Sequence, residues 1–232
     1  MAIQGGFESA VIRHAIIMAA GRGMRMAPLT DAIPKPMAPY DGTTLIARGI
    51  KRLAGRIEHI HVTVGYKKAM LAQHVIEHGA SSVFNTEGQS NCWWVYHTLL
   101  KSLDEPMFVL TCDNVVDLDL AMLHENYLAL GRPACMLVPV LPVAGLEGDY
   151  VFHDNHVVTE ISRNRPTEIY CSGIQVLNPA RVNRLTTEGA SFYDVWQQLI
   201  EQKKLYVSSV YPKKWFAVDT IEQLTEVNKA PF

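Results

Sequence analysis

The feature that most constrains this chain is a short apolar run that passes directly into a glycine-rich, basic loop. Residues 15–20 are continuously apolar, the pattern of a strand covered on both faces in a parallel sheet. Gly21 and Gly23 follow, and a backbone without a Cβ can turn sharply there and present its amides to phosphate oxygens. Arg25 and Lys35 add positive charge. The stretch therefore predicts a phosphate-binding loop after a buried strand.

This loop differs from the two commonest phosphate-binding motifs. It lacks the Gly-Lys-Ser/Thr ending of a Walker loop and the third glycine of the dinucleotide-binding type. A strand and tight turn without a ligand would explain the glycines, but it would leave Arg25 and Lys35 unexplained. We therefore favour phosphate binding over a purely structural turn.

The chain resembles the nucleotidylyltransferase family, which includes the sugar-nucleotide pyrophosphorylases, in two linked motifs. The family signature runs Leu-Ala-Ala-Gly-x-Gly-Thr-Arg-Met/Leu and is followed, about ten residues later, by Pro-Lys-Pro. Residues 18–26 and 34–36 fill both motifs here, with Met24 in place of the threonine. The resemblance implies that Arg25 and Lys35 are catalytic. It also implies that the NTP is bound by Ala19, Ala20, Gly21, Arg22, Gly23 and Met24.

Length and composition fit one α/β domain without a polyanionic partner. The 232 residues are 48% hydrophobic, and the formal charge of -2 comes without a lysine or arginine run. We therefore expect no nucleic-acid or membrane partner. The four cysteines form no Cys-x-x-Cys pair, which favours reduced thiols over a zinc site. No apolar run reaches membrane-spanning length, and no signal peptide is apparent, so we expect a cytoplasmic enzyme, with a homo-oligomer left open.

Strands and helices alternate along the chain after an irregular lead-in over residues 1–13. The expected strands cover residues 15–20, 59–65, 82–85, 107–112, 134–140, 150–153, 156–161, 169–177 and 205–210. The expected helices cover residues 43–53, 67–78, 92–102, 179–185, 192–202 and 221–229. This order predicts a Rossmann-like mixed, mostly parallel sheet flanked by helices. We expect a single domain over 1–232, with a nucleotide-binding half (14–130) and an acceptor-binding half (131–232).

Two acidic residues are candidate metal ligands. Asp113 ends an apolar strand, where a carboxylate needs a cation partner, although a turn or cap role is the alternative. The family resemblance implies that this Asp binds magnesium. Many sugar-nucleotide members carry a second metal Asp two residues after a Trp, but Ala217 occupies that slot. Asp219 lies two residues further on the same strand face, as in the phosphocholine and inositol-phosphate cytidylyltransferases. We assign Mg²⁺ to Asp113 and Asp219.

The segments that would recognise the base and the acceptor carry weaker signals. Amide side chains offer donors and acceptors together, so Asn85, Gln89 and Asn91 are candidates for reading the base. An Asn at this position, before a helix, resembles the pattern of the cytidylyltransferases of phosphocholine type. The alternative role of Asn91 is a helix cap. The resemblance to sugar-phosphate members implies that Glu160, Arg163 and Gly173 contact the acceptor.

These observations predict a magnesium-dependent nucleotidylyltransferase that joins an NTP to a small phosphorylated acceptor. A sugar 1-phosphate is favoured because the acceptor segment follows the sugar-phosphate layout. The first alternative is a CTP-dependent enzyme acting on phosphocholine, a phosphonate or an alditol phosphate. The second is a non-catalytic nucleotide-binding subunit, since Ala217 departs from the commonest metal site.

Overall fold

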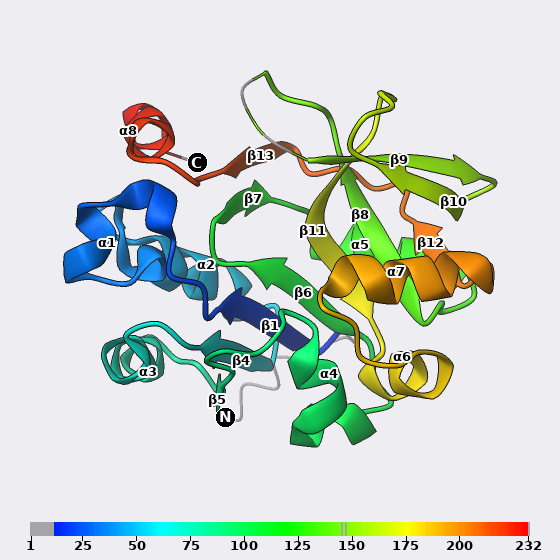
Figure 1. Ribbon diagram of the computed structural model, residues 1–232, viewed down its shortest axis with the longest axis horizontal. Helices are drawn as coiled ribbons and strands as arrows, with labels where there is room; N and C mark the ends of the chain where they lie inside the picture. The colour runs from blue at the N-terminus through cyan, green and yellow to red at the C-terminus, as the bar shows by residue number, and fades with distance from the viewer. Residues whose placement is uncertain (1–11, 145, 147, 232) are drawn as a thin grey trace, which may run out of the picture.

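A mixed sheet of nine strands forms the centre of the molecule (Figure 1). The computed structural model describes residues 12–144, 146 and 148–231, so the lead-in expected over 1–13 lies almost entirely outside the described residues. The strand order is β5-β4-β1-β6-β11-β8-β12-β10-β9. The bounds are β1 His14–Ala19, β4 His59–Val64, β5 Ser82–Asn85, β6 Met107–Thr111, β8 Cys135–Val140, β9 Asp149–Asp154, β10 Val157–Ser162, β11 Tyr170–Leu177 and β12 Leu205–Val207.

Helices cover both faces of this sheet, which explains why β1 is apolar from Ala15 to Ala19. Ile17 packs into one core cluster with residues of α2, α3 and α5, whereas Ile16 packs into the other with residues of α4, α6 and α7. The helices are α1 Leu29–Ala32, α2 Leu45–Leu53, α3 Lys68–Glu77, α4 Trp93–His97, α5 Leu120–Ala129, α6 Pro179–Leu185, α7 Phe192–Glu201 and α8 Ile221–Lys229. The predicted Rossmann-like α/β fold is confirmed.

Strand direction changes across the sheet. β4, β1 and β6 are parallel neighbours, and β5 extends the parallel set at one edge. β11 then pairs antiparallel with both β6 and β8, which joins the strands of the second half to those of the first. The carboxyl ends of β1 and β6 consequently lie side by side, at the edge where open α/β sheets bind ligands.

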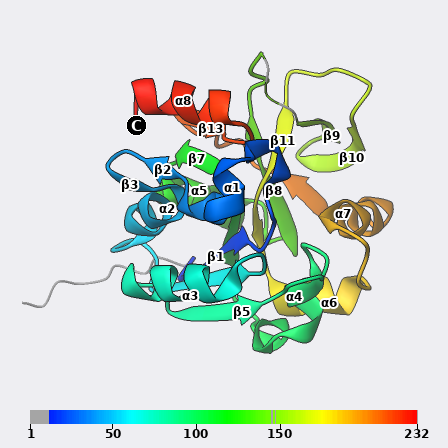
Figure 2. The same ribbon diagram turned by 60° about the vertical axis from the view of Figure 1, so that its left-hand side comes forward.

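A small second sheet lies beside the main one. β7 (Asn114–Asp117) pairs antiparallel with β13 (Lys214–Ala217), and Asn114 lies opposite Ala217. Figure 2 shows α8 running over these two strands. A third core cluster packs Val218 and residues of α8 against Met26, Tyr40 and Val115. The C-terminal segment is thereby anchored next to the loop that follows β1.

Several elements differ from the expected ones, among them α1 and the short strands β2 (Pro39–Tyr40) and β3 (Thr43–Thr44), which were not expected. β7 and α5 were not expected, because neither has a clear apolar period in the sequence. The single helix expected over 92–102 is interrupted at Thr98, whose backbone is extended. The Thr98 hydroxyl donates to the carbonyl oxygen of Trp94 and accepts from the backbone N–H of Leu100, so it ends α4 and starts the 3-10 helix η3 (Leu99–Ser102).

Two expectations from composition are addressed by the described residues. All four cysteines are free thiols, and Cys92, Cys135 and Cys171 are buried. Among the helices that the structure describes, none is long and apolar enough to span a bilayer.

A histidine pair between β1 and β4 makes stability depend on pH. His61 is 8% exposed, its Nε2 lies 3.1 Å from Nδ1 of His14, and its Nδ1 lies 2.7 Å from the Ser82 hydroxyl. Burial, with smaller contributions from His14 and His59, lowers the pKa of His61 from 6.5 to about 4. The folded state therefore disfavours the protonated imidazole. The contribution of His61 to folding stability is therefore fully present above about pH 6.5 and is lost as the pH drops toward about 4.

We expect wild-type protein to lose on the order of 2 kcal/mol of unfolding free energy between pH 7 and pH 4.5 from this residue. His61→Gln should show a shallower pH dependence, measured by urea denaturation at several pH values. His153→Gln, which removes an exposed histidine, is the matched control. An unchanged pH slope in His61→Gln would contradict this assignment.

Candidate active site

The loop after β1 packs against the Pro-Lys-Pro segment. Gly23 has a φ of 68°, and a Cβ there would lie 2.6 Å from the Cβ of Lys35. Glycine is therefore required at this position both by its backbone conformation and by the close approach of Lys35. A Cβ on Gly21, in contrast, would meet no atom within 4 Å. The two halves of the sequence signature are thus in direct contact.

Lys35 lies at the centre of the site. It is 7% exposed, and its Nζ donates to Asp113 Oδ2 and to Asp219 Oδ1, each at 2.7 Å. Burial disfavours the charged ammonium, but the Asp113 charge and the two hydrogen bonds outweigh burial and raise the pKa of Lys35 above its ordinary value. Arg25 Nη2 lies 3.0 Å from Asp219 Oδ1. The structure therefore brings Arg25, Lys35, Asp113 and Asp219 together.

Backbone hydrogen bonds connect the segments that carry the two carboxylates. The N–H of Cys112 donates to the carbonyl oxygen of Met18, which ties the end of β6 to β1. The N–H of Val218 donates to the carbonyl oxygen of Asp113 at 3.0 Å, directly beyond the β7–β13 pair. Asp219 precedes Thr220, the N-cap of α8, and its N–H donates to the Gln223 side chain at 2.7 Å.

A polar network holds Asp113 on its other side. The Thr111 hydroxyl donates to Asp113 Oδ1, and the Asn114 amide group donates to that hydroxyl. Trp215 Nε1 donates to Asn114 Oδ1 at 2.6 Å. Asn114 and Trp215 are therefore site residues that the sequence analysis did not select, although both adjoin motifs that it did.

Two cavities meet at these residues. The first, about 470 Å³, lies along the loop after β1, and the second, about 750 Å³, lies toward β11 and α7. The residues that line both cavities are Arg25, Asn91, Thr111, Asp113 and Asp219. Within the charged cluster of Arg25, Lys35, Asp113 and Asp219, all but Lys35 therefore lie between two spaces large enough for separate ligands.

The first cavity contains most of the predicted nucleotide-binding residues. Its lining includes Ala20, Gly21, Gly23, Met24, Gln89 and Asn91, together with Thr63, Thr86 and Trp94, which sequence reasoning missed. Ala19, Arg22 and Asn85 are absent from this lining among the described residues. Ala19 is buried in β1, the Arg22 guanidinium lies over the Tyr66 ring, and the Asn85 side chain accepts from the backbone N–H of Glu87.

Asn91 connects the two halves of the chain. Its Oδ1 accepts a hydrogen bond from the backbone N–H of Phe192 at 2.8 Å. The N-cap of α4 is Cys92, so the helix-cap role considered for Asn91 is wrong. The Asn91 side chain instead holds the start of α7 against the nucleotide-side loop.

The second cavity contains two of the three predicted acceptor residues. Arg163 and Gly173 line it, and Arg163 Nε donates to Asp149 Oδ1 at 2.9 Å. Glu160 is not among the described lining residues, because its carboxylate turns to Arg165 at 2.5 Å. The sequence analysis also did not select the aromatic residues of this lining, which are Tyr170, Phe192, Tyr193, Trp196 and Trp215.

The carboxylates suit a hard divalent cation. Asp113 Oδ2 and Asp219 Oδ1 contact the same ammonium, so these two oxygens lie no further apart than twice the 2.7 Å bond length. Within the described part of the chain there is no cluster of three or more His, Cys, Asp or Glu residues suited to a metal. Two carboxylates that leave room for phosphate oxygens and water are the usual protein contribution to a magnesium site.

A parallel-stranded α/β core with a glycine loop and paired carboxylates at its carboxyl edge defines a nucleotide-binding protein. The chain belongs to the MobA-like NTP transferase domain family, whose model matches residues 15–162.

Sequence relatives of the chain include a guanyltransferase and a bifunctional protein. It is 30% identical over 219 residues to a mannose-1-phosphate guanyltransferase from Pichia angusta, a match covering 88% of this chain and 60% of that protein. It is 28% identical over 120 residues to the bifunctional protein GlmU of Methanococcus maripaludis, covering 51% of this chain and 29% of that one. The chain thus spans about 60% of the length of the guanyltransferase.

Solved structures share the fold over nearly the whole chain. The inositol-1-phosphate CTP transferase from T. maritima superposes with a TM-score of 0.74 at 17% identity, covering 95% of this chain and 98% of that one. The CTP:phosphocholine cytidylyltransferase from Streptococcus pneumoniae gives a TM-score of 0.74 at 19% identity, covering 93% and 97%.

Proposed function

We propose that the protein is a magnesium-dependent nucleotidylyltransferase that transfers NMP from an NTP to a phosphomonoester and releases pyrophosphate. The observation that carries this proposal is the position of Arg25, Asp113 and Asp219 on the boundary shared by two cavities, with Lys35 bonded to both carboxylates from the first cavity. A group transferred from one ligand to the other must pass that boundary. An NTP substrate also favours action in the cytoplasm.

The proposed reaction is a direct displacement. A phosphate oxygen of the acceptor attacks the α-phosphorus of the NTP, the bond to the β-phosphate oxygen breaks, and its electron pair leaves with pyrophosphate. Arg25 and the loop amides hold the β- and γ-phosphates, while Lys35 orients the α-phosphate and the acceptor phosphate. Asp113 and Asp219 would hold Mg²⁺, which supplies charge neutralisation on the phosphates. The protein itself forms no covalent bond to the substrate.

A sugar 1-phosphate is the acceptor we favour. The relatives named above include a mannose-1-phosphate guanyltransferase, and the second cavity is lined by the Asp149–Arg163 pair, which can hydrogen-bond sugar hydroxyls. The alternative is a CTP-dependent enzyme for phosphocholine, a phosphonate or an alditol phosphate. The aromatic rings of the same cavity support it, because aromatic faces also attract an ammonium group.

This assignment is tested by a screen of pyrophosphate release. The screen combines each of CTP, UTP, GTP and dTTP with sugar 1-phosphates, phosphocholine and alditol phosphates. We expect one NTP with a sugar 1-phosphate to exceed phosphocholine by about 10⁴-fold, because a site built for hydroxyls leaves buried polar groups unpaired with an acceptor that lacks them. Turnover of phosphocholine at a rate comparable with the best sugar 1-phosphate would favour the CTP-dependent alternative. Nucleotide binding without turnover of any pair would favour the non-catalytic subunit.

A further inference from the structure

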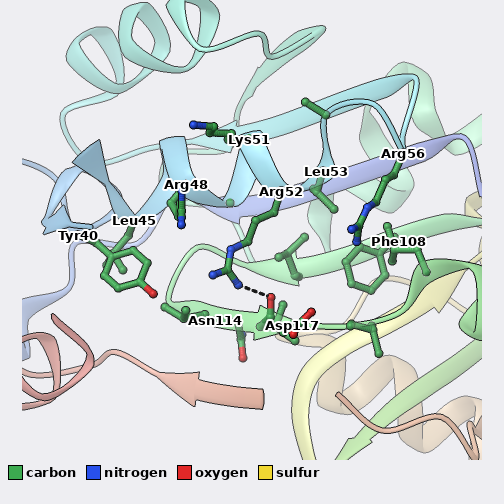
Figure 3. A pocket seen from close by; sticks show the side chains of 17 residues that line it. Tyr40, Leu45, Arg48, Lys51, Arg52, Leu53, Arg56, Phe108, Asn114 and Asp117 are labelled. Atoms are coloured by element: carbon green, nitrogen blue, oxygen red, sulfur yellow. Dashed lines mark hydrogen bonds between the residues drawn. The ribbon is translucent and has the colours of Figure 1, made fainter. Parts of the chain in front are cut away.

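A third cavity lies between α2 and the strands β6 and β7 (Figure 3), and among its described lining residues it shares Asn114 with the second cavity. The volume of the third cavity is about 440 Å³. Arg25, Lys35, Asp113 and Asp219 do not line it. One side is the polar face of α2, and the other is formed by residues of β6 and by residues 114–118.

Three arginines at four-residue intervals, Arg48, Arg52 and Arg56, line this cavity. Arg52 Nη1 donates to the carbonyl oxygen of Val116 at 2.7 Å, which Figure 3 shows as a dashed line. Arg48 pairs with Asp41 at 2.5 Å, yet its Nε is buried and without a hydrogen-bond partner among the described residues. Arg56 is exposed, and its guanidinium forms no ion pair with any residue that the structure describes.

The described lining of this cavity carries more positive than negative formal charge, although Arg48 is paired with Asp41. Like charges four residues apart destabilise a helix, and Asp117 is the only carboxylate among the described lining residues. Burial, together with the charge of Arg48, lowers the pKa of Arg52 below its ordinary value despite Tyr40, Asp117 and Asp41 nearby. An anion between the guanidinium groups would offset both the repulsion between these groups and the cost of burying the charge of Arg52.

The rest of the described lining is mostly apolar, and its other polar residues are Tyr40, Lys51, Asn114 and Asp117. Its other walls are formed by Leu45, Leu53, Phe108, Leu110, Val115, Leu118 and Leu120. In Figure 3 the Phe108 ring lies beside Arg56, whereas Lys51 points away from the space that Arg52 faces. A fitting ligand therefore has an anionic end toward the arginines and an apolar body toward these side chains.

We propose that this cavity binds a small phosphorylated molecule whose ring packs on the apolar wall. Phosphate is the anion that suits it, because planar guanidinium groups donate paired hydrogen bonds to phosphate oxygens. The ring would contact Phe108 and the leucines. This proposal does not rest on the proposed transferase activity, since it concerns binding at residues outside the charged cluster.

Phenyl phosphate is the probe, titrated by calorimetry into wild-type protein and single variants. We expect Arg56→Gln and Arg52→Gln each to weaken its binding by about tenfold or more, as loss of a charge-assisted hydrogen bond does. Lys101→Gln, which removes an exposed cation from η3, should bind as wild type does. Inorganic phosphate should bind about tenfold more weakly than phenyl phosphate, because it lacks the ring.

Phenyl phosphate could also enter the active-site cavities, so Arg25→Ala is titrated in parallel and should retain the Arg56-dependent binding. Arg56→Gln should leave the fold intact, because this exposed side chain forms no ion pair or side-chain hydrogen bond with the described residues, and circular dichroism checks this. The proposal is overturned by an absence of saturable binding to wild type, by unchanged binding in both arginine variants, or by binding that depends on Arg25 alone. Equal affinities for phenyl phosphate and inorganic phosphate would overturn the role of the apolar wall.

Discussion

Asp113→Ala and Asp219→Ala should each lower kcat/KM for pyrophosphate release by at least about a thousandfold. Both carboxylates contact Lys35 Nζ and would hold the same Mg²⁺. Residues that act as one unit have non-additive effects, so the double variant should be hardly slower than either single variant. The measurement is a steady-state assay with the preferred NTP and acceptor across a range of magnesium concentrations.

Asp154→Ala, which removes an exposed carboxylate at the end of β9, is the matched control for charge. Circular dichroism separates loss of chemistry from loss of fold. Normal magnesium dependence in Asp219→Ala would show that the second ligand is a different residue.

Lys35→Ala should lower kcat/KM by on the order of a hundredfold or more, and so should Arg25→Ala. Negative charge moves onto the leaving pyrophosphate in the transition state, and these cations are positioned to stabilise it. Because its surroundings raise the pKa of Lys35, the ammonium stays charged through neutral pH. The alkaline limb of a pH–rate profile should therefore not report this residue below about pH 10.

Lys68→Ala removes an exposed lysine that pairs with Glu87, and it is the control for a lost positive charge. Turnover near the wild-type value in Lys35→Ala or in Arg25→Ala would refute the role assigned to that residue.

The order of strands and helices could be predicted from the sequence where burial on both faces made most of β1 and β6 apolar, as in residues 15–19 and 107–110. β7 was not readable, because its four residues are stabilised by pairing with β13 at the other end of the chain. α5 was missed for a related reason, since only Leu123 and Tyr127 of its ten residues are buried. Elements that depend on distant partners carry little local signal.

Contacts between distant residues of the site were likewise difficult to predict from the sequence. The glycine loop and Lys35 belong to one local pattern, but Lys35 meets Asp219 across 184 residues, a contact that no spacing rule predicts. The resemblance to known nucleotidylyltransferases implied that Lys35 and Asp219 belong to one site, but it did not predict this contact. Neither the bond between Asn91 and Phe192 nor the turn of Glu160 toward Arg165 follows from residue type, because each depends on which backbone or side chain happens to lie opposite.

The anchoring of Asp219 beside the loop after β1 also determines when the site can first exist during synthesis. Lys35 and Asp113 leave the ribosome long before Asp219 does, and Val218 must reach the core cluster that contains Met26 and Tyr40. At about 5 to 20 residues per second, the 184 residues between Lys35 and Asp219 take roughly 10 to 40 s to make. A nascent chain therefore exposes its phosphate loop for that interval without a complete reaction centre.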